Sequence, residues 1–303
     1  MTRWRRHRSC VLCLFVTCSA LGQSRDLHSD VTKFNVRRKT EHYALAGTVS
    51  DTKLTEFGQV LEYIHRAYAR GFSELIKKAD EEKPGNGAGE PSEDRRFKVT
   101  IFETAAQYQE FGQAYFGERA EHTAGMYVPA VKLLMISAAG SKEKTHRVLF
   151  HEAFHQFMHR HIPNAPLWVN EGLATYYGAA RPTRRGLAFD QRDDGYFQIV
   201  REVASARQLI PLHKLIISDP AEFYSHLGID DIPYDWATVS YAQSYTLCAY
   251  MLSEPNARQH LRKYLRALAE ADSSKEASFI TRRHYTDGLL AAMVGEWLKF
   301  VHR

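Results

Sequence analysis

The chain has 303 residues, of which 44% are hydrophobic, 25% charged and 12% aromatic, and this composition is ordinary for a globular protein with a sizeable core. Its formal net charge of +5 falls to +1 without residues 1–22, because that segment contains four arginines and no acidic residue. The remaining charge excludes a broad basic surface for nucleic acid or for a membrane.

The first 22 residues have the three parts of a secretory signal peptide. Four arginines lie among the first eight residues, residues 10–20 are apolar, and residues 20–22 offer a small-residue cleavage site. The apolar run is shorter than the roughly 20 residues that span a bilayer. We therefore predict a secreted or periplasmic protein without a membrane span. Attachment as a lipoprotein at Cys18 is the less favoured alternative, because the residues before it are larger than usual there.

The N-terminal half of the mature chain alternates between strand and helix patterns. Residues 33–49 predict a short β-hairpin. A helix capped by Asp51 follows, because apolar residues then recur at intervals of three and four up to residue 75. Residues 77–96 concentrate Gly, Pro and charge without apolar periodicity, which predicts a solvated loop.

Beyond this loop, residues 97–101 predict a strand, a helix with Tyr108 follows, and residues 125–136 predict a second β segment. Helical patterns then dominate, starting near Ser141 and again at 194–207, 237–252, 256–270 and 285–302. We thus predict an α+β protein with three parts: the signal peptide at 1–22, an α/β part at 23–140 and a mostly helical part at 141–303.

One stretch contains the candidate metal ligands and the candidate catalytic base. Residues 151–155 read His-Glu-Ala-Phe-His, and on a helix His151 and His155 lie on one face and can present two imidazoles to one metal ion. Glu152, about 100° round the helix, lies beside that ion. The pattern is typical of a zinc-activated water with a carboxylate base. By chance the motif occurs about once in twenty such chains, and the alternative is a helix with two partly buried histidines.

A third ligand is needed, and three residues compete for this position. Glu171 opens a second helical run after a reversal that contains two prolines, and it can face the first helix. His159 lies about 12 Å along the helix from His151, too far to share one zinc ion. His161 has the spacing of the third histidine in the metzincin pattern, but Met158 replaces the glycine needed for the turn. Glu171 is favoured, and His161 remains the alternative.

These residues carry a family resemblance. The motif His151-Glu152-x-x-His155-Gln156, followed by Trp-Val-Asn-Glu-Gly-Leu-Ala at 168–174, resembles the gluzincin metallopeptidases. The similarity is strongest to the secreted bacterial peptidase MA-like group and weaker to aminopeptidase N and thermolysin. It implies a thermolysin-like α+β fold, with a small mixed or antiparallel sheet packed on the motif helix. It also implies one Zn²⁺ held by His151, His155 and Glu171, and Glu152 as general base in the hydrolysis of peptide bonds.

The resemblance extends weakly to residues 241–245 and suggests Tyr241 as the donor that stabilises the oxyanion, since a phenol donates without carrying charge. Tyr241 also fits a core stripe of its helix, and the next candidates are Tyr176, Tyr245 and His226. By the same analogy, residues 131–136 form the edge strand that lines the substrate cleft.

Two departures from the related families matter. The exopeptidase signature Gly-Ala-Met-Glu-Asn is missing near residues 125–139, which favours an endopeptidase acting on peptides or proteins. Thr175 stands where thermolysin-like enzymes have an aspartate that orients a zinc-bound imidazole, so the sequence leaves that partner unidentified. Alternative functions are a secreted binding or scaffold protein that has kept the gluzincin fold, or a zinc hydrolase of a non-peptide substrate.

Overall fold

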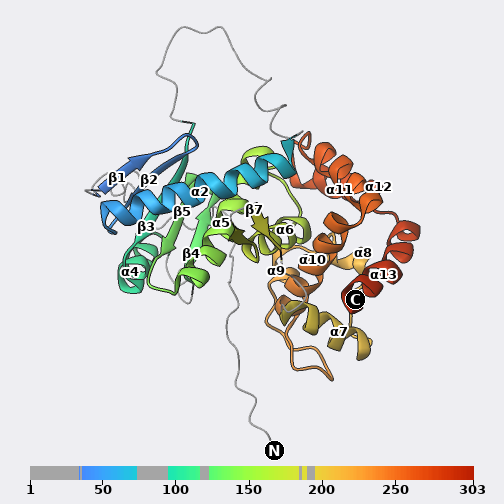
Figure 1. Cartoon of the computed structure of the whole chain (residues 1–303). Helices are drawn as coiled ribbons and strands as arrows, with labels where there is room; N and C mark the ends of the chain where they lie inside the picture. Colours follow the sequence, from blue (N-terminus) through green and yellow to red (C-terminus); the bar gives the residue numbers. More distant parts are fainter. Residues whose placement is uncertain (1–33, 35, 74–94, 117–122, 184–185, 190–194) are drawn as a thin grey trace, which may run out of the picture.

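In the computed structural model, an α+β fold combines a small mixed sheet at one side with most of the helices at the other (Figure 1). The predicted signal peptide lies outside the residues that the structure describes, as does nearly all of the predicted loop at 77–96. In the described part of the chain, no helix is both long and apolar enough to cross a membrane. The described residues are 34, 36–73, 95–116, 123–183, 186–189 and 195–303.

The sheet has five strands in the spatial order β1-β2-β3-β5-β4. Its strands are β1 (Val36–Lys39), β2 (Tyr43–Gly47), β3 (Phe97–Phe102), β4 (Gly125–Val128) and β5 (Leu133–Ser137). Strands β1 and β2 form the predicted antiparallel hairpin, β2, β3 and β5 run parallel, and β4 returns antiparallel to β5. The sheet is therefore mixed, with β1 and β4 as its edges.

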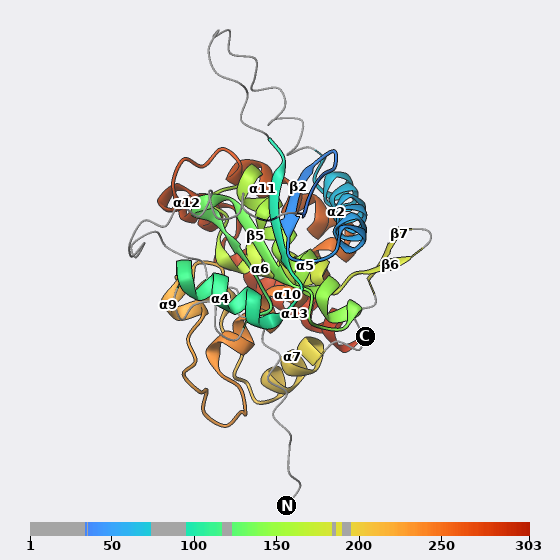
Figure 2. The same ribbon diagram turned by 90° about the vertical axis from the view of Figure 1, so that its left-hand side faces the viewer.

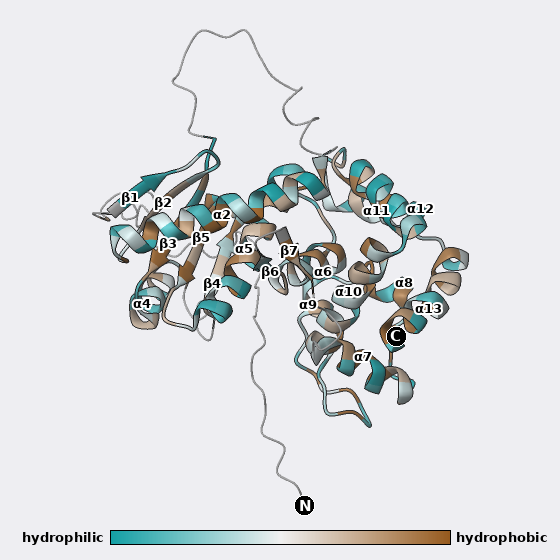
Figure 3. Ribbon diagram, in the orientation of Figure 1, coloured by the Kyte–Doolittle hydropathy of each residue, from teal (hydrophilic) through white to brown (hydrophobic). Residues whose placement is uncertain are grey.

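Helices cover both faces of the sheet. Helices α2 (Asp51–Gly71) and α5 (Lys142–His161) pack on one face, and α4 (Ala105–Phe116) packs on the other (Figure 2). Figure 3 shows the inner strands β3 and β5 as hydrophobic and the edge strand β1 as hydrophilic. Because a strand buried on both faces needs apolar residues at successive positions, β5 begins with the continuous apolar run Leu-Leu-Met-Ile.

Strand β5 shows how the two faces are used. Leu134 and Ile136 belong to the main core beneath α2 and α5, whereas Leu133 and Met135 pack with Tyr108 of α4 in a second cluster. Successive side chains of a strand point to opposite faces, so a single run of sequence fills both layers.

Two expectations about these elements are wrong. Residues 131–136 do not form an edge strand, because β5 pairs with β3 on one side and with β4 on the other. The edge strand beside the motif helix is β4, whose place the apolar pattern alone does not reveal. The N-cap of α2 is Ser50, whose side chain accepts a hydrogen bond from the backbone N–H of Lys53, and Asp51 is the first residue of the helix.

The motif lies on α5, a helix whose central part is buried. This helix begins after Ser141, whose side chain accepts from the N–H of Lys144, and residues 148–158 are buried on every side. Apart from the motif residues and Gln156 this stretch is apolar, and a helix with apolar residues on every side has to be covered by other elements. The sheet covers α5 on one side, and α6 (Leu167–Gly178) covers it on another.

The C-terminal part is helical, with α10 packed along α6 at its centre. Its helices are α7 (Gly195–Ser205), α8 (Leu212–Leu215), α9 (Pro220–Phe223), α10 (Trp236–Ser253), α11 (Pro255–Leu268), α12 (Ser274–His284) and α13 (Asp287–His302). Helix α12 was not predicted, because the residues that it buries most deeply, Ala277 and Thr281, are small and give little apolar signal. A separate two-stranded sheet, β6 (Arg181–Thr183) with β7 (Gly186–Ala188), follows α6.

Gly172 marks the closest approach of α6 to α10. A Cβ atom at this position would lie 2.4 Å from the carbonyl oxygen of Ser244 and 2.6 Å from Sγ of Cys248. The helices must separate to accept it, so we expect Gly172→Ala to lower the free energy of unfolding by about 1–3 kcal/mol in urea denaturation. The matched control is Gly295→Ala in α13, where a Cβ meets no atom within 4 Å. Equal effects in the two variants would contradict this close packing.

Candidate metal centre

Helices α5 and α6 bring three potential ligands to one point. His151 and His155 lie one turn apart on α5, and their Nε2 atoms are 3.0 Å apart. Oε2 of Glu171, on α6, lies 3.4 Å from Nε2 of His151 and 3.5 Å from Nε2 of His155. The structure thus brings together the three residues that the sequence favoured, and this group of buried side chains can hold a metal ion.

The spacing of these three atoms suits a small tetrahedral cation. Zinc ligands at about 2.0–2.2 Å from the ion lie roughly 3.3–3.6 Å from one another in a tetrahedron. The two distances from Oε2 of Glu171 fall in this range, and the two Nε2 atoms, at 3.0 Å, are somewhat closer. The three residues are at most 5% exposed, and Oε2 of Glu171 has no hydrogen-bond partner. A buried carboxylate oxygen without a donor is costly. A cation between the three atoms would satisfy it.

The charges within this cluster compensate one another. Burial by itself raises the pKa of Glu171, but the two neighbouring imidazoles outweigh it and hold the pKa at about 2. Burial lowers the pKa of His155, and the facing carboxylate raises it more strongly, to about 9. The cluster therefore requires positive charge beside Glu171, which a bound cation would also supply.

Glu152 lies beside the cluster and is not one of its three ligands, as the helical geometry predicted. Its Oε2 accepts a hydrogen bond of 2.9 Å from the backbone N–H of Tyr127 on the edge strand β4. Gly125 on the same strand allows this approach, because a Cβ there would lie 2.6 Å from Cγ1 of Val148 and 3.4 Å from Cγ of Glu152. The edge strand therefore sets the direction of the Glu152 carboxylate.

The other two histidines of α5 take different partners. Nδ1 of His159 lies 2.8 Å from the hydroxyl of Tyr127, and the ring of His161 packs 4.6 Å from the ring of Phe157. Neither belongs to the group of atoms that can hold one ion. Of the three candidates for the third ligand, Glu171 is therefore the one that lies with His151 and His155 in a group that could hold a metal ion.

Asn170 supplies the partner for a ligand histidine that the sequence left unidentified. Its Oδ1 lies 3.1 Å from Nδ1 of His155. An amide oxygen can only accept, so Nδ1 of His155 carries the hydrogen, and in the neutral ring the lone pair of Nε2 faces the cluster. Asn170 directly precedes Glu171, so one turn of α6 provides both a potential ligand and the orientation of another potential ligand.

A hydroxyl group that contacts one of the potential ligands belongs to a residue that was not predicted. Tyr224, which directly follows α9, donates a hydrogen bond of 2.7 Å to Oε1 of Glu171. The predicted donor, Tyr241, is buried beside it, with ring centres 6.1 Å apart, and its role stays a prediction. No sequence signal pointed to Tyr224, because it follows a four-residue helix and lies 53 residues after Glu171.

The three alternative donors have other surroundings. Tyr176 stacks on Phe189 at 4.5 Å, and Tyr245 is buried in the main core. Nδ1 of His226 lies 2.9 Å from the carboxylate of Asp235 near the surface.

A second group of possible ligands, Glu41, His42 and Glu62, lies where β2 begins against α2. Both oxygens of Glu62 already have partners: Oε1 accepts from Thr40 and from the backbone N–H of His42, and Oε2 lies 2.7 Å from Nδ1 of His42. Glu41 is exposed. This group is a satisfied hydrogen-bond network and needs no cation, in contrast to the cluster around Glu171.

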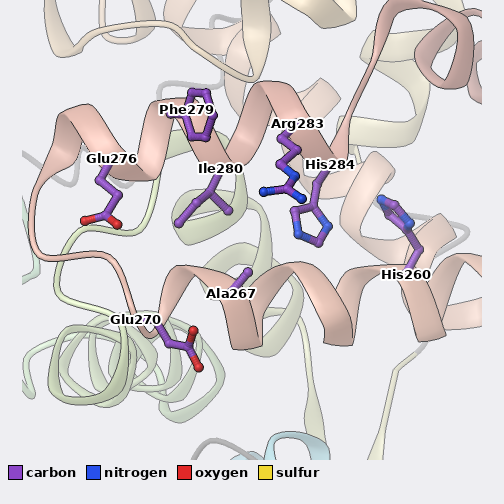
Figure 4. Close-up of a pocket in the computed structure, with 8 residues that line it drawn as sticks. All are labelled: His260, Ala267, Glu270, Glu276, Phe279, Ile280, Arg283 and His284. Carbon is purple, nitrogen blue, oxygen red and sulfur yellow. The ribbon is translucent and has the colours of Figure 1, made fainter.

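A pocket of about 520 Å³ lies between α11 and α12 (Figure 4). His260, Arg283 and His284 lie toward one end, and Glu270 and Glu276 lie toward the other. His151, His155 and Glu171 do not line this pocket. The pocket is therefore separate from the candidate metal centre.

No family model matches the chain, and no curated protein matches it either. The function therefore has to be argued from the residues of this centre.

Proposed function

We propose that the protein is an exported, zinc-dependent metallopeptidase that cleaves peptide bonds within a chain. The observation that carries this proposal is the convergence of three buried ligand atoms, from His151, His155 and Glu171, with Glu152 held beside them. Two imidazoles and one carboxylate are the protein ligands of catalytic zinc sites such as that of thermolysin, which leave one position open.

Each residue would have a distinct task. His151, His155 and Glu171 would hold the ion. When bound, zinc supplies a Lewis acid that polarises a carbonyl group and lowers the pKa of water. Glu152 accepts the proton of the attacking water and passes it to the leaving amine. Its hydrogen bond from Tyr127 holds the carboxylate in place for both transfers. Tyr241 remains the proposed donor to the oxyanion, and its hydroxyl is buried.

The gluzincin fold is part of the same proposal. It is supported by the small mixed sheet packed on the motif helix and by the second helix that supplies a glutamate ligand. The mostly helical part after α5 is also consistent with that family. By the same resemblance, the strand that lines the substrate cleft is β4, since it is the sheet edge next to Glu152. An extended peptide chain can pair with such an edge.

The proposal predicts chelator-sensitive cleavage. The purified mature protein should contain about one zinc ion per chain and should cut a mixed peptide library at internal bonds. A zinc chelator should abolish this cleavage, and added Zn²⁺ should restore it. His151→Ala serves as the control for a contaminating peptidase and should be inactive. If the zinc-loaded protein cuts no peptide of a broad library, the proposed peptidase activity is wrong, and a binding role or a non-peptide substrate is favoured.

A further inference from the structure

The two oxygens of the Glu171 carboxylate have different partners. Oε1 accepts the hydrogen bond of 2.7 Å from the hydroxyl of Tyr224. Oε2 has no hydrogen-bond partner and lies 3.4 Å from Nε2 of His151 and 3.5 Å from Nε2 of His155. One oxygen is therefore held by the protein, and the other faces the place where an ion would bind.

The position of Tyr224 is itself fixed by its short helix. The side chain of Asp219 caps α9 by accepting from the N–H of Glu222, and Phe223 is fully buried in the core. The Tyr224 ring packs 5.2 Å from the ring of Phe223 and 6.1 Å from that of Tyr241. Its hydroxyl thus reaches Glu171 from an anchored segment, which makes it suited to hold a ligand in one orientation.

A carboxylate with two free oxygens can bind a cation through both. A hydroxyl that donates to one oxygen occupies one of its two lone pairs and sets the plane of the carboxylate, and this orientation directs the other oxygen at the cation. The number of protein ligand atoms is then three, and a tetrahedral ion keeps one position for water or substrate.

We propose that Tyr224 is a positioning residue of the metal centre, which directs Oε2 of Glu171 at the ion and prevents Oε1 from joining it. The inference rests on the proposed metal centre, but it does not depend on which substrate is hydrolysed. In this inference Tyr224, which α9 holds in place, keeps one coordination position of the ion open.

The test is to replace zinc by Co²⁺, whose visible absorption is more intense with four ligands than with five or six. Tyr224→Phe keeps the ring and removes only the hydroxyl. The matched control is Tyr234→Phe, which removes a tyrosine hydroxyl that donates to another carboxylate, that of Glu202. We expect Tyr224→Phe to bind Co²⁺ about 10- to 100-fold more weakly and to absorb less intensely, whereas Tyr234→Phe should match the wild type in both.

The outcomes separate this inference from the proposed function. If Tyr224→Phe and Tyr234→Phe have equal Co²⁺ affinity and equal spectra, the inference is wrong and the proposed metal centre is unaffected. The same conclusion follows if Tyr224→Phe binds Co²⁺ more weakly without a change in its spectrum. If the wild type binds no Co²⁺, the metal centre and the inference are both wrong. If Tyr224→Phe shows both the weaker Co²⁺ binding and the weaker absorption but the wild type cleaves no peptide, the inference stands and the proposed peptidase activity is wrong. Thermal unfolding of the metal-free variants checks that both are folded.

Discussion

Replacing Glu152 with glutamine is expected to lower peptide hydrolysis by about 10²- to 10⁴-fold, the usual contribution of general acid–base catalysis. Glutamine has the same shape, and its amide oxygen can still accept the N–H of Tyr127, but it cannot take up a proton at neutral pH. The variant should therefore remain folded and keep its zinc. Turnover of the best library peptide, metal content and thermal unfolding measure these three properties.

The matched control for this prediction is Glu143→Gln. It makes the same chemical change on the same helix, but at an exposed position in the first turn. It should leave turnover and metal content unchanged. A Glu152→Gln variant with wild-type turnover would show that another group accepts the proton, and a variant that has lost its zinc would show that Glu152 helps to hold the ion.

Replacing Glu171 with alanine is expected to remove the bound metal. Loss of one of three protein ligands should weaken binding by more than the 10- to 100-fold typical of residues that only support a ligand. Metal content after dialysis and Co²⁺ titration measure this loss. Because alanine also leaves the hydroxyl of Tyr224 without its acceptor, Glu171→Gln provides a second variant that fills the space and can still accept that hydrogen bond.

His161→Ala is the matched comparison, because His161 was the alternative third ligand and lies near the end of the same helix as His151 and His155. It should retain the metal, since its ring packs against Phe157 and does not belong to the cluster. Metal loss in His161→Ala together with metal retention in Glu171→Ala would reverse the assignment of the third ligand.

The sequence predicted most elements where periodicity was strong. The hairpin of β1 and β2, the long helix α2 and the motif helix α5 all appear near their predicted positions. Helix α12 was not predicted, because its large apolar residue Phe279 is exposed and the residues that it buries most deeply are Ala277 and Thr281. Periodicity reports which face of an element is apolar, and it fails where the buried face is small or polar.

The place of β4 at the sheet edge could not be predicted either. The patterns of β4 and β5 are similar, since every residue of both strands is buried. Which of them is the edge depends on pairing with β3, a strand more than 20 residues earlier in the chain. The expectation that residues 131–136 form the edge was wrong for this reason.

By itself, the sequence determined the pair of imidazoles and the adjacent carboxylate, because the spacing of His151, Glu152 and His155 acts within one helix of fixed rise and rotation. Only the tertiary structure decided how the centre is completed. The choice of Oε2 as the facing oxygen of Glu171, the hydrogen bond from Tyr224 and the contact between Glu152 and β4 all join residues that lie far apart in the chain. Such contacts follow from the packing of whole elements, which local spacing does not encode.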